Sequence, residues 1–147
     1  LIADLPIITD QVLIDGYIEP GSSPNTLANG DNAVILIEID GSSPGIIDVL
    51  NIEAIGCTIR GLVINRAANP NAGRGIFIGA GAVACAIEGC FIGTDPTGTI
   101  ARPNNYGIEL NFYPTNRIGG TTPAARNIIS GNAKTGISIV GASNSII

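Results

Sequence analysis

The stretch CTIRG at residues 57–61 decides the fold, because related stretches return three more times along the chain. They are CAIEG at 85–89, NRIGG at 116–120 and NSI at 144–146. The central isoleucines of these copies follow one another after 28, 31 and 28 residues. A repeat of this length is typical of solenoids, in which each repeat forms one turn that stacks on its neighbours. We therefore expect a ladder of inward isoleucines along one axis, formed by Ile59, Ile87, Ile118 and Ile146.

Two further series recur in the same order between these copies. Each repeat thus holds three short runs rich in β-branched residues, with the alternation that is typical of strands. Because equivalent runs are one whole repeat apart, we expect them to pair in parallel, about 4.8 Å from each other. The two additional series lie at 75–78, 107–110 and 136–139, and at 62–65, 90–93 and 127–130.

The repeats predict an all-β fold, a parallel β-helix of about five coils with three strands each. We expect one domain over residues 1–147, with irregular coils in 1–48 and regular coils in 49–147. Apolar pairs at both ends, Leu1-Ile2 and Ile146-Ile147, lead us to expect a segment of a longer solenoid or a polymer-forming unit. An antiparallel sandwich is the alternative, but it does not require repeats that keep one register.

The composition narrows the classes of function. Charged residues make up 13% of the chain, and the formal net charge is −5 with only seven Lys and Arg residues. Nucleic-acid binding is therefore not expected, because it requires a basic surface that neutralises phosphates. The chain contains no histidine, which removes the commonest general base and metal ligand. No segment reaches the roughly 18 apolar residues of a membrane-spanning helix.

Cys57, Cys85, Asn116 and Asn144 each lie two residues before a ladder isoleucine, so we expect them to form one inward rung. Side-by-side cysteines on parallel strands have an awkward geometry for a disulfide. We therefore expect free thiols that pack as small apolar groups, and no zinc site. The asparagines are expected to hydrogen-bond backbone groups at a turn.

The segment CFIGTDPTGT at 90–99 resembles the NFIGTDxTGT signature of secreted bacterial and archaeal β-helix repeat proteins. IGGTTPAARNIISGN at 118–132 resembles the block that follows this signature in the same family. Residues 14–21 and 60–66 also fit the family, whereas cysteines stand where its members often have Asn or small residues. The resemblance implies a right-handed parallel β-helix of the pectin-lyase-like superfamily and an extracellular setting. It does not imply a reaction.

Asp95, Tyr106, Glu109 and Tyr113 are the candidate residues for a groove that binds a polysaccharide. This fold hosts glycan-cleaving enzymes, which need paired carboxylates or a base near a bound cation. Our alignment places no two acids at equivalent outward positions of adjacent coils, so we assign no catalytic residue. Asp95 lies in a DPTGT turn, where Pro and Gly favour a tight bend. Glu88 occupies the position of Arg60 one coil away, which predicts a surface ion pair between the two.

Two functions of different classes remain open. The preferred hypothesis is a structural or adhesive extracellular module, whose open ends are covered by further coils of the same chain or by identical subunits. The alternative is a domain that binds or cleaves a polysaccharide. Neither hypothesis requires a cofactor or a metal.

Overall fold

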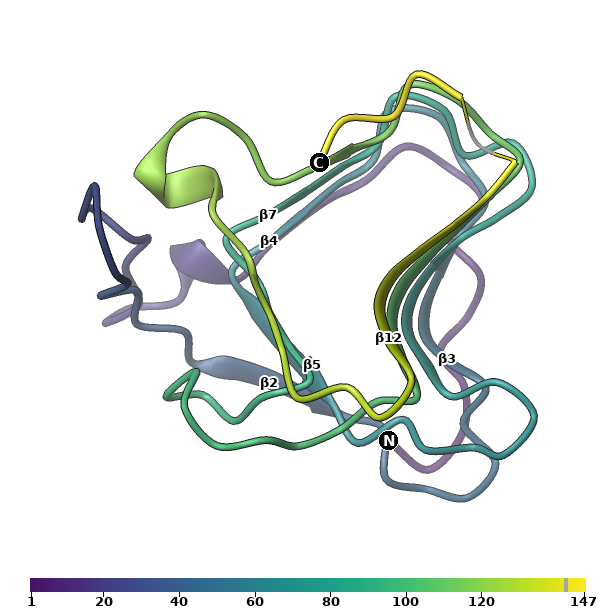
Figure 1. The fold of residues 1–147 in the computed structure, drawn as a ribbon, viewed down its shortest axis with the longest axis horizontal. Helices are drawn as coiled ribbons and strands as arrows, with labels where there is room; N and C mark the ends of the chain where they lie inside the picture. Colours follow the sequence, from purple (N-terminus) through teal and green to yellow (C-terminus); the bar gives the residue numbers. More distant parts are fainter. Residues whose placement is uncertain (142) are drawn as a thin grey trace.

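The computed structural model describes residues 1–141 and 143–147, which form a parallel β-solenoid with a three-sided cross-section (Figure 1). Each side is a four-stranded parallel sheet whose neighbouring strands come from successive turns. The first sheet contains β1 (Leu13–Asp15), β4 (Thr58–Arg60), β7 (Ala86–Glu88) and β10 (Arg117–Ile118). The second contains β2 (Ile37–Asp40), β5 (Leu62–Asn65), β8 (Phe91–Ile92) and β11 (Ile128–Ile129). The third contains β3 (Asp48–Ile52), β6 (Arg74–Ile78), β9 (Tyr106–Asn111) and β12 (Thr135–Val140).

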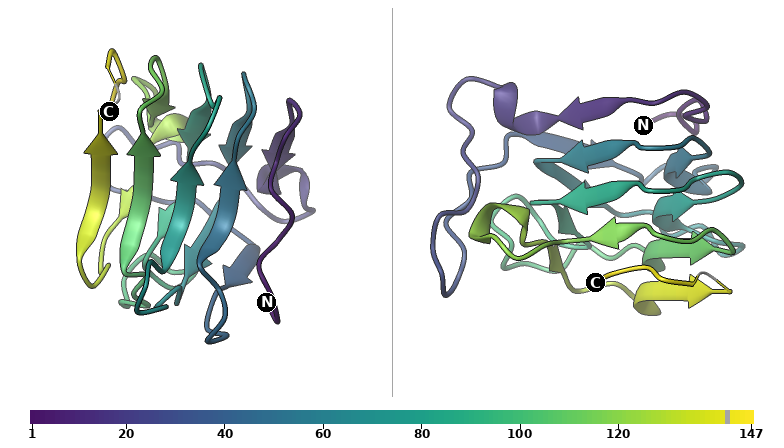
Figure 2. Two further views of the ribbon diagram at one scale, coloured as in Figure 1. Left: turned by 90° about the vertical axis from the view of Figure 1, so that its right-hand side faces the viewer. Right: turned by 90° about the horizontal axis from the view of Figure 1, so that it is seen from above.

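The isoleucine ladder predicted from the repeats is confirmed in the first sheet. Ile59 pairs with Ile87 and Ile87 with Ile118, all in parallel register, and Ile14 extends the ladder by one rung. The two central rungs, Ile59 and Ile87, are fully buried. The stacked strands are visible side-on in Figure 2. The core is therefore a column of aliphatic side chains that runs along the axis.

The other two sheets contribute parallel ladders to the same column. Ile39, Ile64, Ile92 and Ile129 share one register in the second sheet. Leu50, Ile76, Ile108 and Ile137 share one register in the third. The sheets give about four turns, whereas the sequence predicted about five coils. Residues at both ends of the chain add only isolated bridges, Ile8 to Ile52 and Arg117 to Ile146, so they do not complete a further turn.

The last bridge corrects the predicted ladder at its C-terminal end. Ile146 lies opposite Arg117, so it is Ile147 that falls on the register of Ile118. Asn144 is exposed with φ 53°, and Ser145 takes the place that was predicted for it beside Asn116. The last turn is thus one residue longer than the spacing suggested. The shift could not be predicted from the spacing of the isoleucines, because Ile146 and Ile147 both fit the apolar pattern of the ladder.

Glycines lie where successive turns touch through the backbone. A Cβ atom on Gly75 would lie 2.7 Å from the carbonyl oxygen of Gly107, and one on Gly107 would lie 2.4 Å from that of Gly136. These distances leave no room for a side chain. The recurring Gly-Ile pairs of the sequence therefore mark the start of β6, β9 and β12 in the third sheet, whereas β3 has Val49-Leu50 at this position.

The first turn contains a long excursion, residues 16–36, which we call the strap. It leaves β1 through the 3₁₀ turn η1 (Gly16–Ile18) and returns to β2 after an antiparallel bridge between Ser23 and Val34. Figure 2 (right) shows it running down one side of the stack. It reaches η2 (Pro123–Ala125), which belongs to the fourth turn. The strap lies within residues 1–48, for which the sequence led us to expect irregular coils.

Candidate functional site

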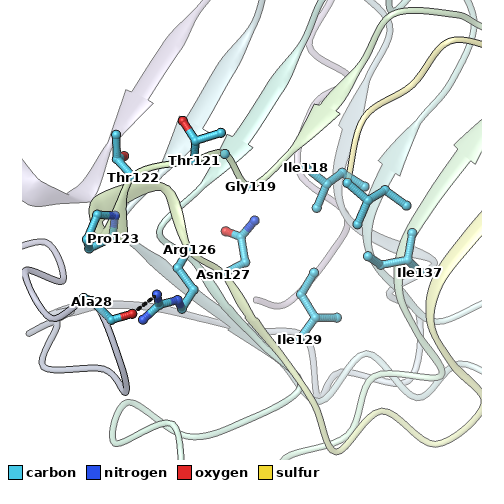
Figure 3. Close-up of a pocket in the computed structure, with 12 residues that line it drawn as sticks. Ala28, Ile118, Gly119, Thr121, Thr122, Pro123, Arg126, Asn127, Ile129 and Ile137 are labelled. Atoms are coloured by element: carbon cyan, nitrogen blue, oxygen red, sulfur yellow. Dashed lines mark hydrogen bonds between the residues drawn. The ribbon is translucent and has the colours of Figure 1, made fainter.

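The C-terminal end of the solenoid exposes the aliphatic column. A hollow of about 410 Å³ opens there, between the last strands of the three sheets. Ile118, Ile129 and Ile137 line it (Figure 3), together with Ile147, and each is a rung of a ladder that is buried in the middle turns. Its rim is formed by Arg126 and by the residues of the turn that precedes η2. The strands β11 and β12 each have one neighbouring strand, so their outer edges carry unpaired N–H and C=O groups, whereas the outer edge of β10 pairs with Ile146.

The residues around this hollow are fixed by hydrogen bonds to the preceding turns. Asn127 accepts a hydrogen bond from the backbone N–H of Cys90 and donates one to the carbonyl of Ile87. The Arg126 guanidinium donates to the carbonyls of Leu27 and Ala28 in the strap. The rim is therefore held by hydrogen bonds to earlier turns, and isoleucine side chains line the surface that it surrounds. Chemically, this end offers strand edges and aliphatic groups, which suit another β-coil.

Asp95 does not belong to a groove but organises its own turn. Its carboxylate accepts hydrogen bonds from the Thr97 hydroxyl at 2.7 Å and from the backbone N–H of Ile100 at 3.1 Å. Gly98 has φ 70°, as the predicted DPTGT turn requires. The hydrogen bond from Thr97 and those from the loop backbone hold the pKa of Asp95 below its ordinary value, against the effect of desolvation. The Asp95 side chain thus stabilises the loop.

Tyr106 and Glu109 lie on the outer face of β9, and both have partners. Glu109 accepts a hydrogen bond from the Arg74 guanidinium at 3.0 Å, and Arg74 also forms a two-pronged ion pair with Asp48 at 2.5 and 3.0 Å. The Lys134 ammonium lies 5.1 Å from the centre of the Tyr106 ring. Burial is the largest influence on the Asp48 carboxyl and raises its pKa. The arrangement joins three successive turns across the third sheet.

Tyr113 lies in a separate hollow at the end of the third sheet. This open hollow of about 390 Å³ contains none of the other three predicted groove residues. It holds half of the chain's aromatic side chains, because Phe77 and Phe112 line it together with Tyr113. Glu53 and Asn111 add acceptor oxygens, and the Oδ1 atom of Asn111 is buried without a hydrogen-bond partner. The predicted groove therefore does not form as one surface.

The rung of Cys57, Cys85 and Asn116 lies inside as predicted. Both thiols are buried and free, and the Cys85 thiol donates to the carbonyl of Ala54 at 3.2 Å. Burial raises the pKa of Cys85, and it raises the pKa of the third cysteine, Cys90, to about 12. The Asn116 amide accepts from the N–H of Cys85 and donates to two carbonyls. The thiols thus fill the core, and the Asn116 amide stabilises the turn around it through hydrogen bonds to the backbone.

The predicted ion pair between Arg60 and Glu88 is wrong, although the two residues share the predicted register. Arg60 pairs instead with Asp15 of the preceding turn at 2.6 Å, and Glu88 pairs with Arg117 of the following turn. Sequence reasoning did not weigh these partners. Asp15 also lies on the Arg60 register, one turn away on the other side, so the spacing alone could not choose between the two acids.

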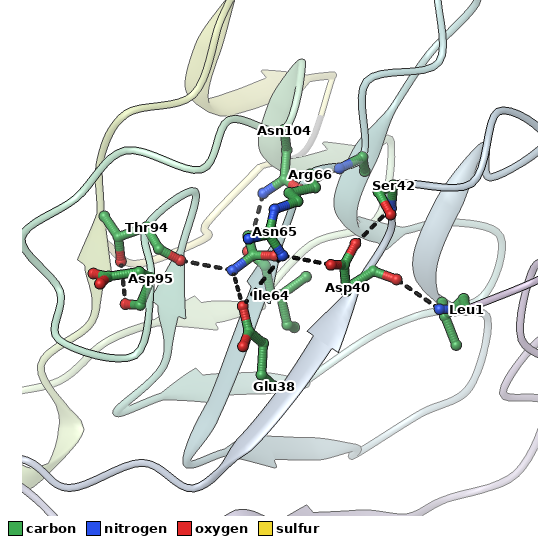
Figure 4. A network of polar contacts seen from close by, with 11 residues as sticks. Leu1, Glu38, Asp40, Ser42, Ile64, Asn65, Arg66, Thr94, Asp95 and Asn104 are labelled. Carbon is green, nitrogen blue, oxygen red and sulfur yellow. Dashed lines mark hydrogen bonds and ion pairs between the residues drawn. The ribbon is translucent and has the colours of Figure 1, made fainter.

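The sequence reasoning also missed buried asparagines at the corner between the second and third sheets. Asn104 accepts a hydrogen bond from the N–H of Ala67 and donates to Ile64 and to the Asn132 side chain one turn further on. Figure 4 shows Asn104 close to Asn65 and Arg66. In the same region, Asn65 donates to Glu38 at 2.7 Å and to the Thr94 carbonyl at 2.9 Å. The spacing of Asn104 and Asn132, 28 residues, was the available signal.

Over residues 1–141 and 143–147, no group of three or more His, Cys, Asp and Glu side chains is placed to hold a metal ion. The same residues contain no helix long and apolar enough to cross a membrane. Comparisons of the chain with protein-family models, with curated proteins and with solved structures find no match.

Proposed function

We propose that this chain is a structural module of an extracellular assembly, a stiff solenoid segment that continues along its axis through further β-coils. The observation that supports this proposal best is the open aliphatic column at the end formed by β10, β11 and β12. Ile147 is 66% exposed there, and Ile129 and Ile137 are partly exposed, although the ladder positions that they occupy are buried in the middle turns. Exposed apolar patches of this kind are typical of interaction surfaces.

A further coil would remove two costs at this end. It would pair the free edge of β12, the longest strand of its sheet together with β9. It would also bury Ile137 and Ile139 in the way that the equivalent Ile108 and Leu110 are buried one turn earlier. Each fully buried side chain of this size contributes roughly 1.5–3 kcal/mol. The occupant is either another coil of the same polypeptide or an identical neighbour.

An extracellular location rests on the resemblance of residues 90–99 and 118–132 to secreted β-helix repeat proteins. The ion pairs are consistent with a structural role. Six ion pairs between residues that the structure describes join adjacent turns: Asp15 with Arg60, Glu38 and Asp40 with Arg66, Asp48 and Glu109 with Arg74, and Glu88 with Arg117. Charged side chains of this kind stabilise the stack from outside, since each is shared between two coils.

Sedimentation of the chain by itself tests axial self-association. We expect the weight-average mass to rise with protein concentration. Ile137→Lys places a charge on the open column and should leave the chain monomeric. Ile55→Lys makes the same change at an exposed turn on the side of the solenoid and should associate like the natural chain. Circular dichroism checks that both variants keep their β-structure. A natural chain that stays monomeric at all concentrations contradicts self-association.

The hollow around Tyr113 supports polysaccharide binding as a second candidate function. Three aromatic rings can stack on the apolar faces of sugar rings. The carboxylate of Glu53, which also lines the hollow, can accept hydrogen bonds from sugar hydroxyls. Gel electrophoresis in the presence of soluble polysaccharides tests this site. Retardation that is lost in Tyr113→Ala, but kept in Tyr106→Ala, supports it, and equal migration with and without every polysaccharide rejects it.

A further inference from the structure

The strap has an internal structure of its own. The backbones of Ser23 and Val34 exchange hydrogen bonds of 3.0 and 2.8 Å. Asn25 is almost fully buried, and its amide bonds the N–H groups of Leu27 and Asn32. These contacts lie within residues 16–36, so they persist if the strap leaves the solenoid. The strap can therefore move as one unit.

Few polar contacts attach this unit to later turns. The Tyr17 hydroxyl donates to the carbonyl of Gly89, in the third turn, at 2.6 Å. Asn25 donates to the carbonyl of Pro123, in the fourth turn, at 3.2 Å. The strongest attachment is Arg126, whose guanidinium donates to the carbonyls of Leu27, Ala28 and Gly30. The side chain of Arg126, in the fourth turn, thus holds the strap of the first turn by donating hydrogen bonds to three of its backbone carbonyls.

The strap covers an apolar stripe on the outer face of the second sheet. Val63, Phe91 and Ile128 share one register over three turns and point away from the aliphatic column. Val63 and Phe91 are nevertheless buried, because Ile35 and Tyr17 of the strap pack on them, and the turn at Gly98 lies against Phe91 and Ile128. An uncovered stripe of this kind would be an exposed patch on three adjacent strands. The strap therefore hides a second apolar surface, distinct from the open end.

The seam between the strap and the solenoid is less well packed than the core. One hollow, of about 420 Å³, lies between Asp31 and Arg126, and a second, of about 240 Å³, lies beside Tyr17 and Pro24. The Oδ2 atom of Asp31 is buried there without a hydrogen-bond partner. Unfilled volume and unpaired polar atoms both weaken an interface. The seam is thus a contact with two hollows along it and one buried oxygen that has no partner.

We propose that the strap is a latch. It opens as a unit at the Arg126 end while the three sheets stay intact, and opening uncovers Val63 and the side of Phe91 that faces Ile35 and Tyr17. When closed, it holds the first turn against the fourth, so that strand β2 cannot separate on its own. This device does not depend on the function of the open end. It is a local opening with a free energy below that of global unfolding.

Hydrogen exchange measured by mass spectrometry tests the latch. We expect the amide of Ile35, a strap residue buried against Val63 and Phe91, to exchange through an opening that leaves β6 and β9 protected. Arg126→Ala removes three charge-assisted hydrogen bonds and should speed exchange of the strap about 10- to 100-fold. It should also speed exchange of β2 and increase the fluorescence of an apolar dye. Arg102→Ala is the matched control, since Arg102 has no ion pair in the part of the chain that the structure describes.

Two results would overturn the latch. The first is equal exchange of the strap and of β6 and β9 in the natural chain, which means that the strap opens only with the whole molecule. The second is an Arg126→Ala variant in which the strap exchanges as slowly as before. If Arg126→Ala does not fold, Tyr17→Phe provides the same test, because it removes only the hydroxyl that bonds Gly89. It should then speed exchange of the strap alone, and unchanged exchange would again contradict the proposal.

Discussion

Single buried amides hold the corners of this solenoid. A corner turns the backbone away from its ladder, so some N–H and C=O groups have no partner on the next strand. Asn116 bonds one N–H and two carbonyls at the corner after the third sheet. Asn127 bonds one of each at the corner between the first and second sheets. A side-chain amide suits this position because it carries both a donor and an acceptor.

Replacing Asn116 with alanine should therefore destabilise the protein strongly. The change leaves the N–H of Cys85 and the carbonyl of Ala82 buried without partners. We expect a loss of about 3 kcal/mol in the free energy of unfolding, measured by urea denaturation. Asn29→Ala, at an exposed position of the strap, is the control and should change stability by less than about 0.5 kcal/mol. Equal effects of the two changes would argue against the role given to Asn116.

Backbone contact at the glycines leads to a second prediction at the scale of one residue. Gly75→Ala would place its Cβ 2.7 Å from the carbonyl oxygen of Gly107, which is part of the next turn. We expect a loss of about 1–3 kcal/mol from overpacking. Gly45→Ala adds the same methyl group where no atom lies within 4 Å. Its thermal midpoint should stay unchanged or rise slightly, because alanine restricts the unfolded chain. A Gly75→Ala variant as stable as Gly45→Ala would contradict this packing.

At the scale of elements, the strands of adjacent turns are joined by side chains on their outer faces. Asp15 at the end of β1 pairs with Arg60 at the end of β4. The hydrogen bond from Arg60 is the main reason why the pKa of Asp15 is lower than its ordinary value, and the N–H of Tyr17 adds to this effect. A carboxyl with a lowered pKa stabilises the fold only while it is ionised.

The stabilising effect of this pair should therefore depend on pH. Asp15→Asn keeps an acceptor for the N–H of Tyr17 but removes the charge that faces Arg60. Above about pH 4, where an unfolded Asp ionises, we expect the variant to be less stable by about 1 kcal/mol. As the pH falls through the lowered pKa, the natural chain loses this advantage and the two proteins converge. Urea denaturation at several pH values measures the difference. A difference that does not change with pH contradicts the ion pair, and exposed Asp10→Asn is the control.

The strands were predictable because their repeats are encoded in apolar spacing, whereas the contacts between them were not. The runs at 62–65 and 90–93 align in the structure as the sequence series suggested. Spacing could not reveal the strap, because its attachments are made by Asn25 and Arg126 to backbone carbonyls nearly a hundred residues away. The prediction of a single groove lined by Asp95, Tyr106, Glu109 and Tyr113 differs from the structure for a related reason. Proximity in sequence placed Asp95 and Tyr113 together, but corners of the solenoid separate them.

At the scale of the whole molecule, charge is unevenly distributed along the axis. No Lys or Arg precedes Arg60, and no Asp or Glu follows Glu109. The first turn is therefore acidic, and the last full turn contains Arg117, Arg126 and Lys134. The net charge of −5 makes separate molecules repel each other at neutral pH. Axial association has to overcome this repulsion.

Association should consequently be strongest near the isoelectric point of about 4.4. We expect light scattering of concentrated protein to rise as the pH falls from 8 toward this value, because repulsion between molecules decreases. Added salt at pH 8 should act in the same direction by screening the charges. Ile137→Lys should scatter less than Ile55→Lys in both series. Equal scattering by these two variants would show that aggregation, and not contact at the open end, is being measured.

The ladders also set how the length of such a protein can change. From Ile59 to Ile87 the chain makes one turn with 28 residues, and from Ile87 to Ile118 it makes one turn with 31. An insertion of a complete turn brings its own rung to every ladder, whereas a fractional one would twist all later rungs out of line. The lengths of related solenoids along the axis should therefore differ by whole multiples of the strand spacing, about 4.8 Å.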